Sequence, residues 1–297
     1  RWLEAAALAP VAASGSLPIF DGVAVFGAAV PLAEAAASFA GARSAGIRAG
    51  MEAPFTIRSA ADRPAAERRL LRALGKKTDG FMERNVERPI SRRLSAWLAR
   101  TQITPNQMTL LSAAVGLSAA PFFLSAVPLW QTMGALLFLA HSILDGCDGE
   151  LARLKFQESR WGGILDFWVD NVVHSAIFGC MAVGWSHAID ADWPLALGIA
   201  AVLGTLGSAG FVYWRVMRPK RDGGPLYTSV SQAPSGALTQ LLDSLSRRDF
   251  IYLVLLLSVP GKAAWFLAMA ATGAPIFFVL LLVVAAKDRR AGPAVNA

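Results

Sequence analysis

The chain has 297 residues, of which 55% are hydrophobic and 16% are charged, and its net charge is +7. This composition excludes an ordinary soluble domain and indicates an integral membrane protein. The basic residues lie beside the apolar segments and no nucleic-acid-binding motif accompanies them, so we do not expect a nucleic-acid partner.

The first 62 residues are rich in Ala and Gly and are expected to lie outside the membrane. Their most apolar stretch, 17–40, contains Asp21, Pro31 and Glu34. Because an acidic residue at the centre of a span costs ~2.5 kcal/mol or more, this stretch does not indicate a transmembrane helix. We assign residues 1–62 to an extramembrane segment whose fold the sequence leaves open.

Residues 63–104 form a basic juxtamembrane region. Between Arg63 and Arg100, eleven Lys or Arg residues accompany four Asp or Glu residues, and apolar residues recur at helical spacing. This pattern predicts amphipathic helices at the membrane surface, broken near 75–80 and at Pro89. A basic helix that packs on its own protein fits the same pattern, and the two interpretations are compatible.

Hydropathy predicts an all-α polytopic membrane protein with six transmembrane helices in a domain of residues 105–290, followed by a short tail at 291–297. The expected spans are about 107–127, 131–153, 161–186, 193–216, 246–259 and 263–286. The last two form a hairpin, and its turn is expected at Pro260 and Gly261 or, alternatively, near 271–275.

The distribution of basic residues predicts the orientation of these spans. Basic clusters lie on one side of the predicted topology, whereas the 187–192 loop contains Asp190 and Asp192 but no Lys or Arg. By the positive-inside rule, we expect both termini on the cytoplasmic side of a bacterial or archaeal inner membrane. The second span would then run inward and end in acidic residues, and the third would begin beside them.

Four aspartates stand out in these two spans. Asp145 and Asp148 are three residues apart, and Asp166 and Asp170 are four apart, so each pair shares a helix face. Carboxylates at membrane depth are costly and mark functional sites. Their convergence would require divalent cations, and the absence of a His or Cys cluster in the sequence favours hard ions such as Mg²⁺, Mn²⁺ or Ca²⁺.

The residues between the aspartates suit a phosphate ligand. Gly149 and Gly162 leave room beside the carboxylates, and Ala152 lies on the same helix face as Asp145. Arg153 offers a guanidinium that can bind phosphate through two hydrogen bonds. We interpret the group as a metal site that holds a pyrophosphate.

The pattern Asp145-x2-Asp148-Gly149-x2-Ala152-Arg153-x8-Gly162-x3-Asp166-x3-Asp170 resembles the motif of the CDP-alcohol phosphotransferase family. The resemblance covers roughly residues 76–290 and implies a membrane enzyme, usually a homodimer, that transfers a phosphoryl alcohol from a CDP-alcohol and releases CMP. It implies that Asp145, Asp148 and Asp166 bind two metal ions, Mg²⁺ or Mn²⁺. Asp170 would be the general base and could share in binding the metals. The remaining motif residues, Gly149, Ala152, Arg153 and Gly162, would line the CDP site.

The segment Thr104 to Thr109 has two interpretations. Thr104 as a cap and Pro105 in the first turn predict a helix start. Many family members carry a similar stretch whose Pro, Asn and Thr approach the nucleotide. By that resemblance, Pro105, Asn106 and Thr109 are further candidates for the nucleotide site.

The sequence features that bear on the acceptor alcohol point in different directions. The basic residues Arg215, Arg218, Arg247 and Arg248 mark the cytoplasmic side or form a pocket for a phosphorylated acceptor. Relatives that use inositol phosphate often carry Arg after the fourth aspartate, where this chain has Asn171. In contrast, residues 78–95 are similar to the linker of di-inositol-phosphate-phosphate synthase domains. His141 and His174, one turn from the aspartates, are contacts of the site or are satisfied by neighbouring helices.

We therefore predict a metal-dependent CDP-alcohol phosphotransferase of phospholipid or related phosphodiester synthesis. Its donor would be of the CDP-diacylglycerol or CDP-inositol type, and membrane lipids would surround it. An alternative is a CDP-inositol-dependent di-inositol-phosphate-phosphate synthase-like enzyme. An ion-coupled transporter is a remote alternative, since neither internal repeats nor broken mid-membrane helices are evident in the sequence.

Overall fold

The computed structural model describes residues 17–19, 55–57, 65, 71, 74, 80–218 and 249–291, with side chains of the last stretch as far as Ala286. The chain divides into two compact units, Arg1–Gly75 and Lys76–Ala297. In the first unit, strand β1 (Leu17–Ile19) pairs antiparallel with β2 (Phe55–Ile57). The sequence did not predict these strands, because three residues are too few to show a periodicity.

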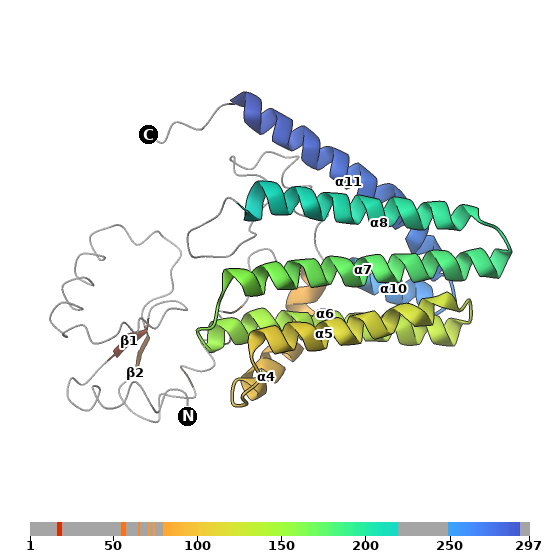
Figure 1. Ribbon diagram of the computed structural model, residues 1–297. Helices are drawn as coiled ribbons and strands as arrows, with labels where there is room; N and C mark the ends of the chain where they lie inside the picture. The colour runs from red at the N-terminus through yellow and green to blue at the C-terminus, as the bar shows by residue number, and fades with distance from the viewer. Residues whose placement is uncertain are drawn as a thin grey trace. The chain divides into compact units, whose positions relative to one another are not determined.

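The second unit is all-helical in its described part, as predicted. Its elements are η2 (Glu83–Glu87), α4 (Arg88–Leu98), α5 (Pro105–Ala119), η3 (Ala120–Leu124), α6 (Pro128–Leu154), α7 (Arg160–Ile189), α8 (Trp193–Val212), η4 (Tyr213–Met217), α10 (Phe250–Ser258) and α11 (Ala263–Ala291). Figure 1 shows α5, α6, α7 and α8 aligned lengthwise, with α11 crossing α8 obliquely. The buried core includes Phe123, Phe138 and Ile177.

Among the residues that the structure describes, four helical segments are long and apolar enough to cross a membrane: Pro105–Leu124, Arg160–Ile189, Trp193–Met217 and Ala263–Ala286. They are consistent with a polytopic membrane protein and coincide with four of the six predicted spans. Helix α6 has a suitable length but carries the acidic motif, and α10 has only nine residues. The number of six spans therefore stays a prediction.

The start of α5 follows its sequence closely. Thr104 Oγ1 accepts a hydrogen bond from Gln107 N (3.3 Å), and Gln107 Oε1 accepts one from Thr104 N (2.9 Å), which makes a capping box. Pro105 occupies the first turn, where its missing N–H costs nothing. This confirms the helix start expected there.

The hairpin between α10 and α11 turns at Gly261, whose φ is +73°. The alternative turn near 271–275 is wrong, because α11 continues through Pro275. A Cβ on Gly204 of α8 would lie 2.6 Å from Pro275 N, so the glycine allows the two backbones to approach closely at this proline. Packing against α8 thus favours a continuous helix where the local sequence suggests a break.

The expected break at Pro89 is also wrong. Residues 81–98 are helical throughout, and the turn before the proline widens into the π-helical η2, with Arg88 N donating to Glu83 O. The widening accommodates a ring that would clash with the carbonyl four residues earlier. Of the other expected break, at 75–80, only Gly80 is among the described residues, and Arg247 and Arg248 lie outside them.

Helix α4 lies in the predicted juxtamembrane region and has two different faces, and its place at the membrane surface stays a prediction. One face is buried against α6 through Arg88, Ser91, Ser95 and Leu98. The other face exposes Ile90 and Trp97 together with Arg93. The helix is amphipathic as predicted, and it also packs on its own protein.

Candidate metal and nucleotide site

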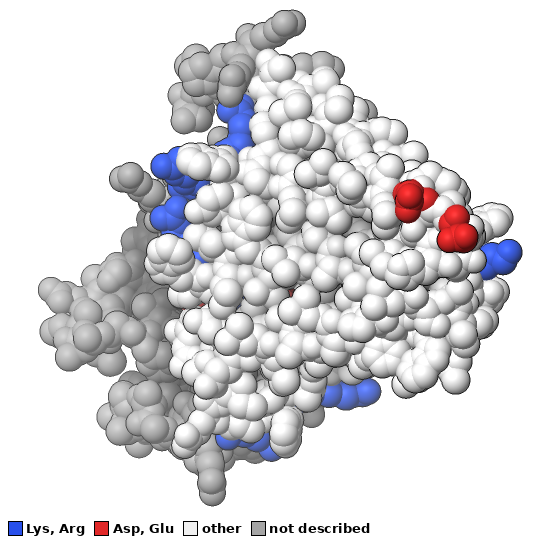
Figure 2. Space-filling view, turned by 45° about the vertical axis from the view of Figure 1, so that its right-hand side comes forward, with Lys and Arg blue, Asp and Glu red and all other residues white. Residues whose placement is uncertain are grey.

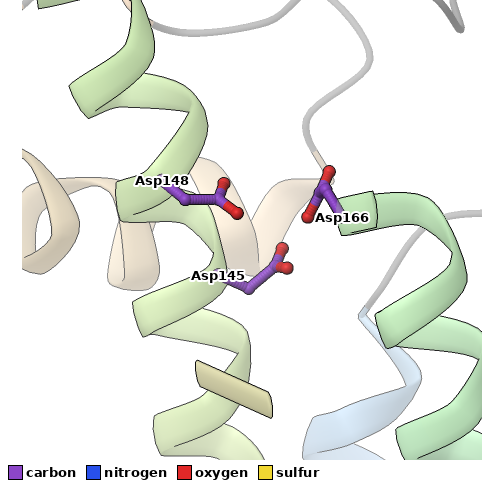
Figure 3. A group of neighbouring side chains, drawn as sticks. All are labelled: Asp145, Asp148 and Asp166. Carbon is purple, nitrogen blue, oxygen red and sulfur yellow. The ribbon is translucent and has the colours of Figure 1, made fainter. Parts of the chain in front are cut away.

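Helices α6 and α7 bring three of the four aspartates together. Asp145 and Asp148 lie near the end of α6, and Asp166 lies in the second turn of α7. Figure 3 shows the three carboxylates pointing toward one another from the two helices. One ligand oxygen from each lies within 4.8 Å of the others. This spacing suits carboxylates that share metal ions.

The segment between α6 and α7 is short, so the end of α6 and the start of α7, which carry the three aspartates, lie close together. Gln157 N donates to Ala152 O (2.8 Å), which closes the end of α6. Ser159 caps α7 by accepting a hydrogen bond from Gly162 N (3.0 Å). Lys155 Nζ donates to Thr101 O and Ile103 O, each at 2.7 Å, and fastens the segment before α5 to the end of α6. The three helix ends thus meet around the aspartates.

The donor set fits divalent metal ions. The exposed fractions of Asp145 and Asp148 are 4% and 5%. Within the described residues, Asp166 Oδ1 is buried without a hydrogen-bond partner. Three carboxylates this close repel one another, and burial removes the water that would screen them. Hard cations would neutralise the charge and supply the missing partner of Asp166.

Asp170 lies one turn beyond Asp166 on α7 and is not a member of this group of three. Its Oδ1 lies 3.5 Å from His141 Nε2, and His141 Nδ1 lies 2.9 Å from Ser112 O. His141 is therefore positioned against Asp170 by α5. His174 packs edge-on against Phe138, with ring centroids 5.3 Å apart.

Helix α5 supplies the third wall of the site. Thr109 is 2% exposed, and its hydroxyl donates to Asp148 Oδ2. Asn106 lies beside the start of α7, since a Cβ on Gly162 would come within 3.0 Å of Asn106 Oδ1. The structure thus brings the predicted nucleotide residues of α5 next to the motif of α6 and α7. It also directs the Thr109 hydroxyl at a carboxylate.

The remaining motif residues lie along α6. A Cβ on Gly149 would lie 3.8 Å from Arg153 Nη1, so the guanidinium lies over this glycine. Ala152 and Arg153 are half-buried. An arginine beside the carboxylates can contact phosphate that the metals do not neutralise.

Of the four arginines that are candidates for an acceptor pocket, the structure describes Arg215 and Arg218. Arg215 is half-buried in η4, and the Arg218 guanidinium stacks on the Trp214 ring at 4.0 Å. Arg160 Nη2 donates to Arg218 O (2.9 Å), which joins the end of η4 to the start of α7. Figure 2 shows acidic side chains together toward the right of the view with a basic side chain beside them, and further basic side chains toward the left and the bottom. Asn171 Nδ2 donates to Phe167 O (2.7 Å) of its own helix.

Glu150, which is fully buried and binds α4, is not among the site residues predicted from the sequence. An acid inside a predicted span and the spacing of Arg88, Ser91 and Ser95 were signals that could have revealed it.

Comparisons with known proteins bear on the family of the chain. A family model described as CDP-alcohol phosphatidyltransferase matches residues 102–286. The chain is 40% identical over 105 residues to a bifunctional IPC transferase and DIPP synthase of Archaeoglobus fulgidus; the match covers 35% of this chain and 20% of that protein. It is 33% identical over 106 residues to a phosphatidylinositol phosphate synthase of Streptomyces avermitilis, covering 35% and 42% of the two chains.

Among solved structures, the phosphatidylinositol phosphate synthase of Mycobacterium tuberculosis with CDP-DAG bound aligns with 66% of this chain and 93% of its own, at 17% identity and a TM-score of 0.45. The chain thus matches about a fifth of the length of the Archaeoglobus relative and less than half of the Streptomyces one. The family model nevertheless spans more than half of the chain and includes all four aspartates, so the chain belongs to the CDP-alcohol phosphatidyltransferase family.

Proposed function

We propose that this protein transfers a phosphoryl alcohol from a CDP-alcohol to a second alcohol and releases CMP. The observation that carries the proposal is the convergence of three carboxylates from α6 and α7, two of them buried, with one oxygen of each within 4.8 Å of the others, in a chain of this family. A pyrophosphate-bearing donor is the kind of substrate that such a site suits, because metals held there can bind its oxygens.

Two divalent ions, Mg²⁺ or Mn²⁺, would be held by Asp145, Asp148 and Asp166, with Asp170 sharing in their binding. When bound, they would neutralise the pyrophosphate and stabilise the charge on departing CMP. Arg153 would contact a phosphate oxygen, and Gly149 and Gly162 would line the nucleotide site.

Around the metals, the residues of the chain would orient the reactants. Ala152, Pro105 and Asn106 would line the nucleotide site. Asp170 would accept the proton of the incoming hydroxyl, with His141 held beside its carboxylate at 3.5 Å. Positioning and electrostatics would supply most of the catalysis, as in other phosphoryl transfers.

The donor is of the CDP-diacylglycerol or the CDP-inositol type. A phosphatidyl donor is supported by the phosphatidylinositol phosphate synthase relatives. The alternative, an enzyme like a di-inositol-phosphate-phosphate synthase, is supported by four relatives named bifunctional IPC transferase and DIPP synthase. Arg215, Arg218, Arg247 and Arg248 would attract a phosphorylated acceptor in either case.

A screen of purified protein tests the reaction. CDP-diacylglycerol and CDP-inositol are each combined with glycerol phosphate, inositol, inositol phosphate or serine, and CMP release is measured. We expect metal-dependent CMP release with one donor and one acceptor class. Absence of CMP with every pair would refute a CDP-alcohol transferase and leave the transporter alternative.

In the membrane, we propose six spans and a homodimer, with both termini and the aspartates on the cytoplasmic side. Residues 1–62 would be extramembrane, 63–104 juxtamembrane, 105–290 the transmembrane domain and 291–297 a tail. A thiol probe that does not cross the membrane should label Asp190→Cys and Arg93→Cys from opposite faces, with Arg93→Cys cytoplasmic. Labelling of both from one face would overturn this topology.

A further inference from the structure

Glu150 is a fully buried acid on α6, two residues after Asp148. Its Oε1 accepts hydrogen bonds from Arg88 Nη1 (3.0 Å) and Ser91 Oγ (2.9 Å), and its Oε2 accepts one from Ser95 Oγ (2.8 Å). The three donors follow one another at spacings of three and four on α4, so they form one stripe of that helix. Both oxygens of Glu150 are therefore bonded to α4.

This stripe lies behind the metal-binding face of α6. Successive residues of an α-helix are rotated by roughly 100°, so Asp148 and Glu150 point to nearly opposite sides. Gly146, next to Asp145, also faces α4, because a Cβ there would lie 3.5 Å from Arg88 Nη1. Helix α4 thus supports the turn of α6 that carries the two aspartates, on the side away from Asp166.

Helix α4 is itself fixed by further polar contacts. Arg88 Nη2 forms a salt bridge with Glu83 Oε1 (2.8 Å). One turn before Asp145, Ser142 Oγ of α6 donates to Oε2 of Glu87 (2.8 Å), the last residue of η2, which continues directly into α4.

At the start of this helix, the backbone N–H groups of Phe81 and Met82 donate to the Asp249 carboxylate (3.1 and 3.2 Å), just before α10. The 81–98 helix is therefore joined to two neighbouring helices and does not lie loosely on the membrane surface.

The energetics of a buried carboxylate make this contact specific. An ionised acid removed from water needs a counter-charge and hydrogen bonds, and losing one partner leaves a costly buried charge. Rotation or sliding of α6 against α4 would separate Glu150 from its donors. The contact therefore favours one rotation and one register of α6.

We propose that Glu150 is a positioning residue: through Arg88, Ser91 and Ser95 it holds α6 in the rotation that directs Asp145 and Asp148 at Asp166. This inference rests on the proposed function, since the site that is positioned is the metal site of that function. Glu150 is not a metal ligand in this scheme, because its carboxylate faces α4.

Direct Mn²⁺ binding to the purified full-length protein tests the inference. Free Mn²⁺ is measured by electron paramagnetic resonance in titrations of the wild type, Glu150→Gln and Arg93→Gln. The amide of Glu150→Gln keeps the shape but removes the charge that Arg88 faces. We expect its Mn²⁺ dissociation constant to rise about tenfold or more, as when groups that orient metal ligands are removed. Arg93→Gln removes an exposed charge from the other face of α4 and should bind as the wild type does.

A second variant covers the case in which Glu150→Gln does not fold. Ser91→Ala with Ser95→Ala keeps the ion pair and removes two of the three donors, and should raise the dissociation constant about threefold or more. A purely structural role would lower the yield and melting temperature but leave the affinity of the folded protein unchanged. Affinities within twofold of the wild type, for whichever of these variants fold, would overturn the inference.

The same titration separates this inference from the proposed function. If the wild type binds Mn²⁺ but releases no CMP with any donor, the proposed function fails. The Mn²⁺ dissociation constants of the variants still decide whether Glu150 positions the metal site. If the wild type binds no Mn²⁺, there is no metal site for α4 to position, and the inference is overturned as well.

Discussion

Gly184→Ala should destabilise the protein, because α7 passes unusually close to the backbone at the end of η3. A Cβ on Gly184 would overlap Phe123 O and approach Leu124 Cα to 2.9 Å. These are backbone atoms, which cannot move aside as a flexible side chain does. Either α7 or η3 must shift, although both lie in the main core beside Phe123.

The magnitude follows from two opposing effects. Forcing an extra methyl into a well-packed core costs about 1–3 kcal/mol. Alanine in place of glycine within a helix contributes about 0.5–1 kcal/mol of stability. Gly179→Ala on the same helix isolates the second effect, because no atom of the described chain other than its own helix and neighbours lies within 4 Å of its added Cβ. The difference between the two variants is therefore the steric cost alone.

Thermal unfolding of the purified protein in one detergent measures this difference. At about 2–4 °C per kcal/mol for a domain of this size, Gly184→Ala should melt about 2 °C or more below Gly179→Ala. Gly179→Ala should melt at or slightly above the wild-type temperature. Equal melting temperatures for the two alanine variants would refute the close approach of α7 and η3.

The other predictions concern the site. Chelation of divalent metals should abolish CMP release and added Mg²⁺ or Mn²⁺ should restore it; full activity in excess chelator would contradict the two-metal proposal. Asp170→Asn should bind Mn²⁺ and nucleotide while turnover collapses, whereas Asp145→Asn should weaken Mn²⁺ binding itself; near-normal turnover of Asp170→Asn would exclude it as the base. Thr109→Val should raise the half-saturating metal concentration about tenfold, because Asp148 loses a donor that orients it, and Thr109→Ser should restore it. A higher KM for the CDP-alcohol at unchanged metal dependence would instead make Thr109 a nucleotide contact.

The local pattern of the chain was enough to predict most helices. The capping box at Thr104 and the apolar lengths around α7, α8 and α11 are properties of contiguous residues, and the structure has these helices where they were expected. The spacing of Asp145 and Asp148 also sets their common face, because helix geometry relates residues three apart in the same way in any protein. Long-range packing was not needed for these predictions.

Two predictions failed at prolines that were expected to break a helix. Pro89 and Pro275 each suggested a break, yet the helices continue because a π turn accommodates the first and close packing against Gly204 favours the second. Whether a proline ends a helix depends on what the freed carbonyl and the ring contact in space. That information is not local.

The sequence by itself determined the chemistry of the site: four aspartates, an arginine and two glycines at spacings that helices present in a defined way. Only the tertiary structure decided what holds this chemistry in place. Glu150 is 62 residues from Arg88, and Thr109 is 39 residues from Asp148, so each pairing depends on which helices pack together. Both contacts arise because burial leaves a carboxylate no water to bond, so each must find its donors on whichever helix packs against it.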